Sequence, residues 1–424
     1  MRAQQIRTDS ADTLRFGSGS FGAAGLAIAA TTCGLLGVFV TSSLAPLLRS
    51  DGIVTPAGLG IATAVFFGVS AVVAPMGGRL ADRFGSVRVM RVALVVAAAS
   101  MLAVAVGVTG WQELAVVLGF AGATNGAIQP STNRYISRLV PSNRQGLAFG
   151  VKQAAIPMAI LLGGLAVPVA AHVSGWRSIY YFGAAFSLGA ALLIRTPSPA
   201  AVKPQVAASS AAAGRTGPPL PRRALIVLAS GWGLASAGAN ALGAFFVLGA
   251  VHAGFATVTA GMLAVLGSVA SIATRIALGA FADRRSGRGF GVVAAMSAVG
   301  AVSVALLATD QGWAFFLAAV IGYGIGWGWA GVFNYAIVQT SPGRPGRTTG
   351  ITQAGAGAGA CLGPLAFGAL LTHTGYAWAW LAAGAALLLA SVVITVGRGM
   401  LPAQVCTQGG ASSSACEDEP DHHG

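Results

Sequence analysis

The sequence predicts an all-α membrane protein with twelve transmembrane helices arranged in two six-helix bundles. Three observations support this prediction: the scarcity of charge, the number and length of the apolar runs, and a repeat between the two halves of the chain. Of the 424 residues, 55% are hydrophobic and only 8% are charged, against about 25% charged residues in a soluble domain. The chain therefore cannot cover itself with a water-facing surface, and we expect it to lie in a lipid bilayer.

The apolar runs are long enough to cross a membrane. A bilayer core about 30 Å thick needs about 20 residues of apolar helix. Glycine and proline inside such runs are tolerated because neighbouring helices satisfy the backbone groups that they free. Runs that fit this length lie at residues 21–45, 55–77, 90–109, 112–133, 147–171, 178–194, 224–249, 258–281, 290–309, 313–338, 349–371 and 377–397.

The basic residues set the expected orientation. The chain has 25 lysine and arginine residues against 11 aspartate and glutamate residues. Nearly all the bases lie in one alternate set of loops, and the opposite set holds only Arg49 and Arg177. Basic loops remain in the cytoplasm, so both termini are expected inside, as an even number of spans requires. Because the bases lie between apolar runs and not on one folded face, we expect no nucleic-acid partner.

A polar linker divides the chain into two bundles. Residues 196–223 are rich in proline, alanine and serine, and they separate six spans in residues 1–195 from six spans in residues 224–398. Residues 399–424 form a polar tail with an acidic end, which we expect to be disordered. The preference for arginine over lysine and the excess of alanine and glycine indicate a bacterial gene, and hence the bacterial cytoplasmic (plasma) membrane.

The two halves repeat each other at an offset of about 200 residues. Chance matching of glycines is the alternative explanation in a glycine-rich chain, but the shared Asp-Arg and Gln positions argue against it. A parallel repeat of six spans is typical of secondary transporters, whose substrate site lies between the halves near the midplane. Matching positions are Gly150 and Gly350, Gln153 and Gln353, Arg144 and Arg344, and the Asp-Arg pairs at 82–83 and 283–284.

The loop between the second and third spans carries a family motif. The segment GGRLADRFGSVR at residues 77–88 resembles the signature loop of the major facilitator superfamily, and a degenerate copy, GAFADRRSGR, lies at residues 279–288. The resemblance covers nearly the whole chain. It implies a two-bundle carrier that works by alternating access. Spans one, four, seven and ten would then line the cavity, with spans two, five, eight and eleven beside them.

The same loop has a chemical rationale as a gate. A carboxylate at the cytoplasmic end of a span can accept charge-assisted hydrogen bonds from helix N-terminal amides or from an arginine of a neighbouring helix. Such a contact can form in one state of a carrier and break in the other. An ion pair that only fixes the topology is the alternative. The gating candidates are Gly78, Asp82, Arg83, Gly85, Arg144, Asp283 and Arg284.

One full charge lies well inside a span. Arg275 precedes Asp283 by eight residues, which places it about 12 Å from the end of its helix. A buried charge needs a partner, and no aspartate or glutamate lies deep within any span. The natural partner is an anionic substrate. The alternative is an arginine that bonds backbone carbonyls or the opposite bundle.

The eighth span also resembles those of the oxalate/formate and monocarboxylate carriers. In those carriers an arginine at the place of Arg275 binds the substrate carboxylate, which the resemblance implies here. Some of them have a lysine in span eleven, where this chain has Thr352, and others have an acid one turn before the arginine, where this chain has Ser271. Lys152 and Arg134 lie nearer the cytoplasmic ends of their spans and are expected to snorkel to the interface, although Lys152 could extend an anion path from Arg275.

Neutral polar side chains gather on the cavity-lining spans. Asn125 and Gln129 lie one helical turn apart and share a face of span four, and Trp327 and Asn334, seven residues apart, share a face of span ten. Each of these groups could bond a substrate or bridge two helices, a contact worth about 0.6 kcal/mol. The candidate substrate-binding residues are Arg275, Asn125, Gln129, Gln153, Asn240, Trp327, Asn334 and Gln353.

The sequence thus predicts a monomeric secondary transporter for a small organic anion, in the simplest case a carboxylate. The alternative is an exporter of a neutral or amphipathic metabolite or antibiotic, which the aromatic residues of span ten would suit. Drug/proton antiporters carry a Gly-Pro motif in span five, whereas here the pair Gly363-Pro364 lies in span eleven. No phosphate-binding loop, nucleophile motif or metal-ligand spacing is present in the sequence, so we expect no enzyme activity, no cofactor and no metal.

Overall fold

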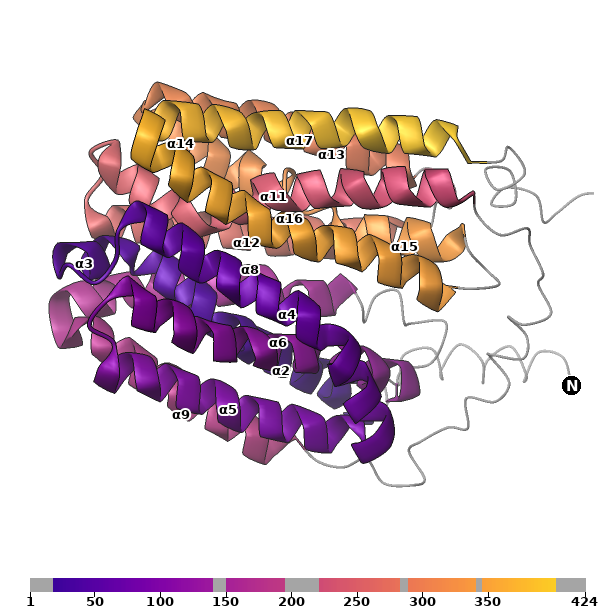
Figure 1. Ribbon diagram of the computed structural model, residues 1–424, viewed down its shortest axis with the longest axis horizontal. Coiled ribbons are helices and arrows are strands. Elements are labelled where there is room, and N and C mark those ends of the chain that lie inside the picture. The colour runs from indigo at the N-terminus through magenta and orange to yellow at the C-terminus, as the bar shows by residue number, and fades with distance from the viewer. Residues whose placement is uncertain (1–17, 140–149, 195–220, 283–288, 341–344, 402–424) are drawn as a thin grey trace, which may run out of the picture.

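The computed structural model describes residues 18–139, 150–194, 221–282, 289–340 and 345–401. Throughout these ranges the regular structure is helical. The helices run along the long axis of the molecule, with those of the N-terminal half on one side and those of the C-terminal half on the other (Figure 1). The all-α, two-bundle fold expected from the sequence is confirmed. The predicted linker at 196–223 and tail at 399–424 lie almost wholly outside the described residues.

The N-terminal half contains the first six predicted spans and a short helix between the first two. The stretch from Gly150 leads into α8 and belongs to the same apolar helix, which extends to Val173. The elements are α2 (Ser18–Ser43), α3 (Ala45–Ser50), α4 (Pro56–Phe84), α5 (Ser86–Gly107), α6 (Trp111–Leu139), α8 (Ala155–Val169), the π-helical turn η2 (Ala170–Ser174) and α9 (Gly175–Leu193).

The C-terminal half has the same plan with a more irregular tenth span. The end of the molecule at which α2 begins and α17 ends is called the terminal face here, and the other end the opposite face. The elements are α11 (Arg222–His252), α12 (Thr257–Ala282), α13 (Gly289–Ala305), η4 (Leu306–Thr309), α14 (Gly312–Leu317), η5 (Ala318–Gly322), α15 (Ala330–Gln339), α16 (Pro345–Thr374) and α17 (Tyr376–Gly399).

Each predicted apolar run coincides with a helical segment. Among the described residues, nine helices are long and apolar enough to cross a membrane by length and composition. The other three predicted spans are α6, α9 and the segment from α14 to α15. The surface of the helices fits a lipid environment, because large apolar side chains point outward, such as Val72, Val106 and Leu192, which are 73%, 73% and 81% exposed. In a water-soluble bundle these side chains would be a liability.

The tenth predicted span is not one continuous helix. After α14 the chain passes through the π-helical turn η5, then through turns at residues 325–329, and becomes helical again at α15. Glycines at 322, 324, 326 and 328 alternate through this stretch, and glycine costs about 1 kcal/mol per residue in a helix interior. Trp327 and Asn334 therefore do not share one helical face, and that prediction is wrong because the break separates them.

Glycine brings the helices of the C-terminal half together at backbone distance. Along one face of α16, a Cβ atom placed on Gly359 would lie 1.8 Å from the carbonyl oxygen of Gly233 in α11. A Cβ on Gly363 would lie 2.2 Å from the carbonyl oxygen of Ala237, one turn further along. The contact between α11 and α16 thus depends on the absence of side chains at these positions.

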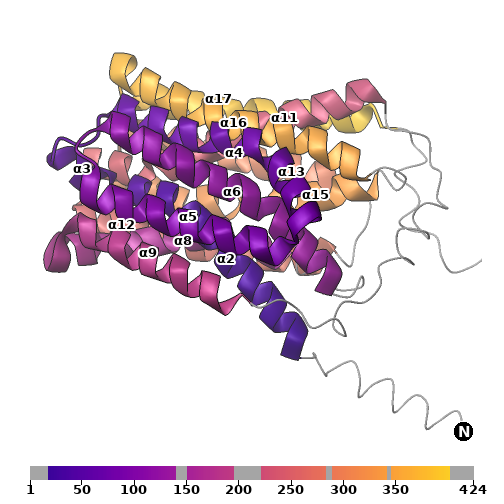
Figure 2. The same ribbon diagram turned by 60° about the horizontal axis from the view of Figure 1, so that its bottom comes forward.

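The two halves meet most extensively where α4 packs on α16 and α8 packs on α12, and α2 also contacts α11. Figure 2 shows α16 lying alongside α4. Toward the opposite face the backbones nearly touch, since a Cβ on Gly60 of α4 would lie 3.2 Å from the Cα of Gly368 in α16. A Cβ on Gly164 of α8 would likewise lie 2.7 Å from the carbonyl oxygen of Gly261 in α12. Small residues therefore join the two halves in both of these helix pairs.

Replacing Gly359 with alanine is expected to lower the apparent melting temperature, because α11 and α16 must separate to admit the methyl group. Overpacking of this kind costs about 1–3 kcal/mol. The matched control is Gly350→Ala in the same helix, where a Cβ would meet nothing within 4 Å. Thermal unfolding of the purified variants in detergent tests the packing, and equal melting temperatures for the two variants would contradict it.

Candidate functional site

Arg275 in α12 is buried at the boundary between the two halves, with 3% of its surface exposed. Its Nη1 donates to the backbone carbonyl oxygen of Gln153 in the N-terminal half at 3.2 Å. Its Nη2 donates to the backbone carbonyl oxygen of Trp327 at 2.7 Å, and its Nε lies 3.4 Å from the Oγ of Ser271. The guanidinium therefore bridges the halves, which is the contact named above as the alternative to a substrate.

Neither carbonyl has its usual backbone amide donor, because the helices around both of them are irregular. In an α-helix the carbonyl of Gln153 would accept from the amide of residue 157, but Pro157 has no N–H to donate. Trp327 lies in the break at residues 325–329, and within the described chain no backbone amide donates to its carbonyl. Away from water such carbonyls need a donor, and Arg275 supplies one to each.

Lys152 is the second buried cation, with 5% of its surface exposed. Its Nζ donates to the Oε1 of Gln129 at 2.8 Å, to the Oδ1 of Asn133 at 2.5 Å and to the backbone oxygen of Gln129 at 3.2 Å. The expectation that Lys152 snorkels to the interface is wrong. Gln129 and Asn133 lie one turn apart on α6 and hold the ammonium inside the bundle.

A chain of hydrogen bonds leads from Lys152 toward α4. The Nε2 of Gln129 lies 3.4 Å from the Oδ1 of Asn125. The Nδ2 of Asn125 donates to the Oγ of Ser70 in α4 at 2.8 Å. Asn125 and Gln129 therefore share a face of α6, as their spacing predicts, and they join spans two, four and five into one polar network.

Neither buried cation has a carboxylate beside it among the described residues. Within that part of the chain, Lys152 and Arg275 are the two buried residues that carry a charge. The four described carboxylates are engaged elsewhere, by an indole, an arginine, a threonine and a histidine. Their partners are Trp176 for Asp51, Arg134 for Asp82, Thr109 for Glu113 and His252 for Asp310.

The remaining candidates of the C-terminal half lie apart from Arg275. Asn240 is buried and donates to the carbonyl oxygen of Ser236 in its own helix at 2.9 Å. Asn334 lies 3.4 Å, through its Oδ1, from the Nε2 of Gln353, which is exposed. The repeat-related residues Gln153 and Gln353 thus make different contacts, one through its backbone and the other through its side chain.

Aromatic rings surround the backbone of the tenth span. The ring of Trp327 packs edge-on against Phe39 of α2, with ring centroids 6.1 Å apart, and lies 5.8 Å from the ring of Tyr323. A Cβ placed on Gly243 of α11 would lie 2.6 Å from the Trp327 ring. Trp327 therefore contributes its ring to the contact between the halves and its carbonyl to Arg275.

The signature loop contains an ion pair within the N-terminal half. Asp82 at the end of α4 pairs with Arg134 of α6, so Arg134, with 27% of its side chain exposed, is held by a carboxylate and does not simply snorkel as expected. Arg83 is exposed and lies over the ring of Phe84, 5.3 Å from its centroid. Of the other gating candidates, Arg144, Asp283 and Arg284 lie outside the described residues.

The three glycines of the loop motif have different structural roles. Gly85 joins α4 to α5 with a φ of 88°, a conformation that other residues seldom adopt. A Cβ on Gly78 would meet nothing closer than the Cβ of Pro130 at 3.8 Å, whereas one on Gly77 would lie 2.6 Å from the Cα of Ala127. The tight contact between α4 and α6 is therefore made by Gly77, which the sequence did not single out.

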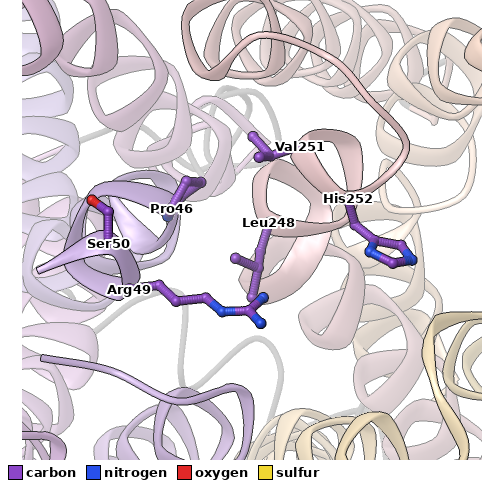
Figure 3. Close-up of a pocket in the computed structure, with 6 residues that line it drawn as sticks. All are labelled: Pro46, Arg49, Ser50, Leu248, Val251 and His252. Carbon is purple, nitrogen blue, oxygen red and sulfur yellow. The ribbon is translucent and has the colours of Figure 1, made fainter. Parts of the chain in front are cut away.

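A cavity of about 340 Å³ lies between the halves at the opposite face. Figure 3 shows Arg49 extending from α3 toward Leu248 of α11. His252, at the end of α11, stacks on Tyr376 with ring centroids 4.0 Å apart. The sequence gave no sign of this cavity, since its walls come from separate spans. The residues that line it are Pro46, Arg49, Ser50, Leu248, Val251 and His252.

Residues 26–352 and 259–399 match the family model of the Major Facilitator Superfamily. The chain belongs to the major facilitator superfamily. Members of this superfamily are membrane transporters and not enzymes, so the protein is a multi-pass transporter for a small molecule. In the described residues, no group of histidine, cysteine, aspartate and glutamate side chains could hold a metal ion.

The names of two similar proteins refer to different kinds of compound. The quinolone resistance protein NorA of Staphylococcus aureus is 27% identical over 149 residues, 35% of this chain and 38% of that protein. The probable sulfoacetate transporter SauU of Cupriavidus necator is 31% identical over 157 residues, 36% of this chain and 35% of that protein. The chain therefore aligns with less than half the length of each.

Solved structures show the same fold over nearly the whole chain. A D-xylose-proton symporter superposes with a TM-score of 0.70 at 16% sequence identity, covering 89% of this chain and 97% of the symporter. The proton:xylose symporter XylE bound to 6-bromo-6-deoxy-D-glucose superposes with a TM-score of 0.68, also at 16% identity. At this identity the likeness extends to the fold and not to the cargo.

Sequence reasoning missed the role of Pro157, although a signal was present. A proline four residues after Gln153 leaves one carbonyl of span five without its helical donor. The polar partners Asn133 and Ser70 were also missed, because nothing in a single sequence aligns α6 with α4 and the start of span five. Arg275, Gln153 and Trp327 meet in space, as do Asn125, Gln129 and Lys152.

Replacing Pro157 with alanine is expected to weaken the bridge between the halves, since the new amide competes with Arg275 for the carbonyl of Gln153. Thermal unfolding of Pro157→Ala, Arg275→Gln and the double variant measures the coupling, which we expect to be about 0.5–3 kcal/mol. Pro168→Ala, in the same helix, is the matched control and should add independently to Arg275→Gln. Additive effects for Pro157→Ala would contradict the assignment.

Proposed function

We propose that this transporter carries a small organic anion, in the simplest case a carboxylate, across the bacterial cytoplasmic membrane. It works by alternating access as a monomer with both termini in the cytoplasm. The observation that carries the proposal is the burial of Arg275 and Lys152 without a carboxylate beside either of them in the described chain. Two buried positive charges with no described carboxylate beside them are favourable positions for an anionic substrate.

Hydrogen bonds to carbonyls satisfy the donors of Arg275 but leave its charge unbalanced. Removing an ion from water costs several kcal/mol even after the protein relaxes, and neutral dipoles recover only part of this. A carboxylate matches the planar guanidinium with two parallel hydrogen bonds. An anionic substrate at Arg275 therefore gains both geometry and charge neutralisation over the backbone contacts that it replaces.

Substrate binding at Arg275 would also act on the two halves. The guanidinium holds the carbonyls of Gln153 and Trp327, which belong to opposite halves. A carboxylate that takes two donors of the guanidinium competes with these carbonyls and loosens the bridge. Because a ligand shifts a conformational equilibrium by its differential affinity for the two states, an anion that replaces the bridge favours rearrangement of the halves.

The neutral candidates would shape the rest of the path. Gln129 and Asn125 present amide groups next to Lys152, and the ring of Trp327 gives an apolar wall beside Arg275. Gln153 contributes its carbonyl. Asn240, Asn334 and Gln353 lie on helices that the family resemblance assigns to the cavity or beside it. The relative SauU supports the anion, because sulfoacetate carries a carboxylate and a sulfonate.

The second candidate function is export of a neutral or amphipathic compound. Two observations favour it: the partial similarity to NorA, whose name records quinolone resistance, and the aromatic group of Phe39, Tyr323 and Trp327. Expression in a drug-sensitised host separates the candidates. Resistance to amphipathic drugs without any response to carboxylates would favour this second function.

We also propose that the signature loop is the cytoplasmic gate. Asp82 and Arg134 form its ion pair in this conformation, and Gly85 provides the turn between α4 and α5. Gly78 and Arg83 complete the described part of the gate, and Arg144, Asp283 and Arg284 would belong to it as well. Because the pair lies within one half, it would act by fixing the end of α4 and not by tying the halves together.

Arg275→Gln is expected to lose anion binding, because glutamine keeps hydrogen bonding but not the charge. Thermal-shift measurements with a panel of carboxylates test this, since a ligand at about 100 times its Kd adds about 2.7 kcal/mol to the folded state. The matched control is Arg91→Gln, because Arg91 also donates to a backbone carbonyl, that of Ile194, at 2.9 Å. An equal shift in wild type and Arg275→Gln would remove Arg275 from the site.

Asp82→Asn is expected to insert into the membrane normally and to abolish transport, because the neutral amide no longer holds Arg134 by charge. Uptake into proteoliposomes of the anion that gives the largest thermal shift measures the effect. The charge-swapped variant Asp82→Arg with Arg134→Asp should restore part of the rate. Full transport by Asp82→Asn would leave the pair with a structural role alone.

A further inference from the structure

We propose that Lys152 is a second cationic group of the substrate site and that it selects anions carrying two negative charges. This inference rests on the proposed function and names the substrate class more closely. Lys152 is not among the substrate-binding residues predicted from the sequence, and here it helps to determine which anions bind.

Arg275 contacts the backbone of the N-terminal half at the residue that follows Lys152. Lys152 immediately precedes Gln153, whose carbonyl oxygen accepts from Arg275 at 3.2 Å. Lys152 belongs to the start of the fifth span and Arg275 to the eighth, and these two helices make one of the two most extensive contacts between the halves. The two buried charges therefore flank a single segment of the interface.

The surroundings of Lys152 are those of a charged amine and not of a packed aliphatic chain. An ammonium has three donors, and Nζ has three acceptors, two from Gln129 and one from Asn133. All three acceptors are neutral. A lysine that served only to join α6 to the fifth span would incur the cost of burying an ion, where a glutamine could make a similar bridge without it.

Two of the three acceptors can be exchanged for a ligand. The Oε1 of Gln129 and the Oδ1 of Asn133 belong to side chains that can rotate, and Asn133 is exposed. The ammonium itself sits on a flexible four-carbon stem. An anionic group can therefore enter beside Asn133 and take over hydrogen bonds from Nζ without a change in the backbone.

Charge balance favours a dianion at this place. The nearby ion pair of Asp82 with Arg134 is neutral as a unit, so Lys152 and Arg275 leave two positive charges in the described interface. A monocarboxylate neutralises one of them and leaves the other buried. A substrate with two anionic groups neutralises both, and the loaded site carries no net charge through the membrane.

The experiment compares dianions with monoanions on the purified transporter. Apparent Kd values for malonate and succinate, and for acetate and propionate, are measured by thermal shift at pH 6.5 and constant ionic strength. We expect the dicarboxylates to bind about tenfold more tightly to the wild type, the effect of about one charged hydrogen bond. Lys152→Gln should lose this preference and keep monocarboxylate binding, whereas Lys152→Arg, which keeps the charge, should retain the preference.

The outcomes separate this inference from the proposed function. Monocarboxylates that bind the wild type as tightly as dicarboxylates overturn the role of Lys152 and leave the anion proposal standing, and the wild-type comparison needs no variant to fold. An unchanged preference in Lys152→Gln also overturns it. If no anion raises the melting temperature of the wild type, or if Arg275→Gln and Arg91→Gln respond to anions alike, the proposed function is wrong. This inference is then wrong as well.

Discussion

Every backbone carbonyl held inside this protein needs a hydrogen-bond donor within the protein, because a bilayer core offers no water. This constraint explains why the irregular places in the helices and the buried arginine coincide. Pro157 and the break at residues 325–329 each leave a carbonyl without its amide donor, and Arg275 has more donors than its own helix can use. Each feature alone would be destabilising, and together they satisfy one another across the two halves.

Glycine determines how closely the other helices pack. Membrane helices associate where small residues let their backbones approach each other. The contact between α11 and α16 and that between α4 and α16 both depend on positions where a single methyl group would overlap a backbone atom. Contacts of this kind hold the helices at fixed distances over long stretches. Polar bridging is then concentrated on the terminal side of the interface, where Lys152 and Arg275 lie.

The sequence predicts the fold far better than it predicts the site. Apolar run length places all the spans, because bilayer thickness acts on each helix separately. The depth of Arg275 follows from its distance to Asp283 along one helix. The burial of Lys152 does not follow, since its acceptors Gln129 and Asn133 come from another helix. The break in span ten also escapes prediction, because membrane helices elsewhere in this chain tolerate equally dense glycine.

Arg275 bonds main-chain oxygens, so the side chains of its partners do not determine the contact. A carbonyl is present whatever side chain stands at its position, so the bridge itself sets no requirement on the side chains at residues 153 and 327. Alanine at residue 153 would leave the bridge intact, and alanine at residue 327 would report the loss of the ring contacts with Phe39 and Tyr323 and not the loss of the bridge. The sequence constraint falls instead on Pro157 and on the glycines around residue 326, which never touch the arginine but create its partners.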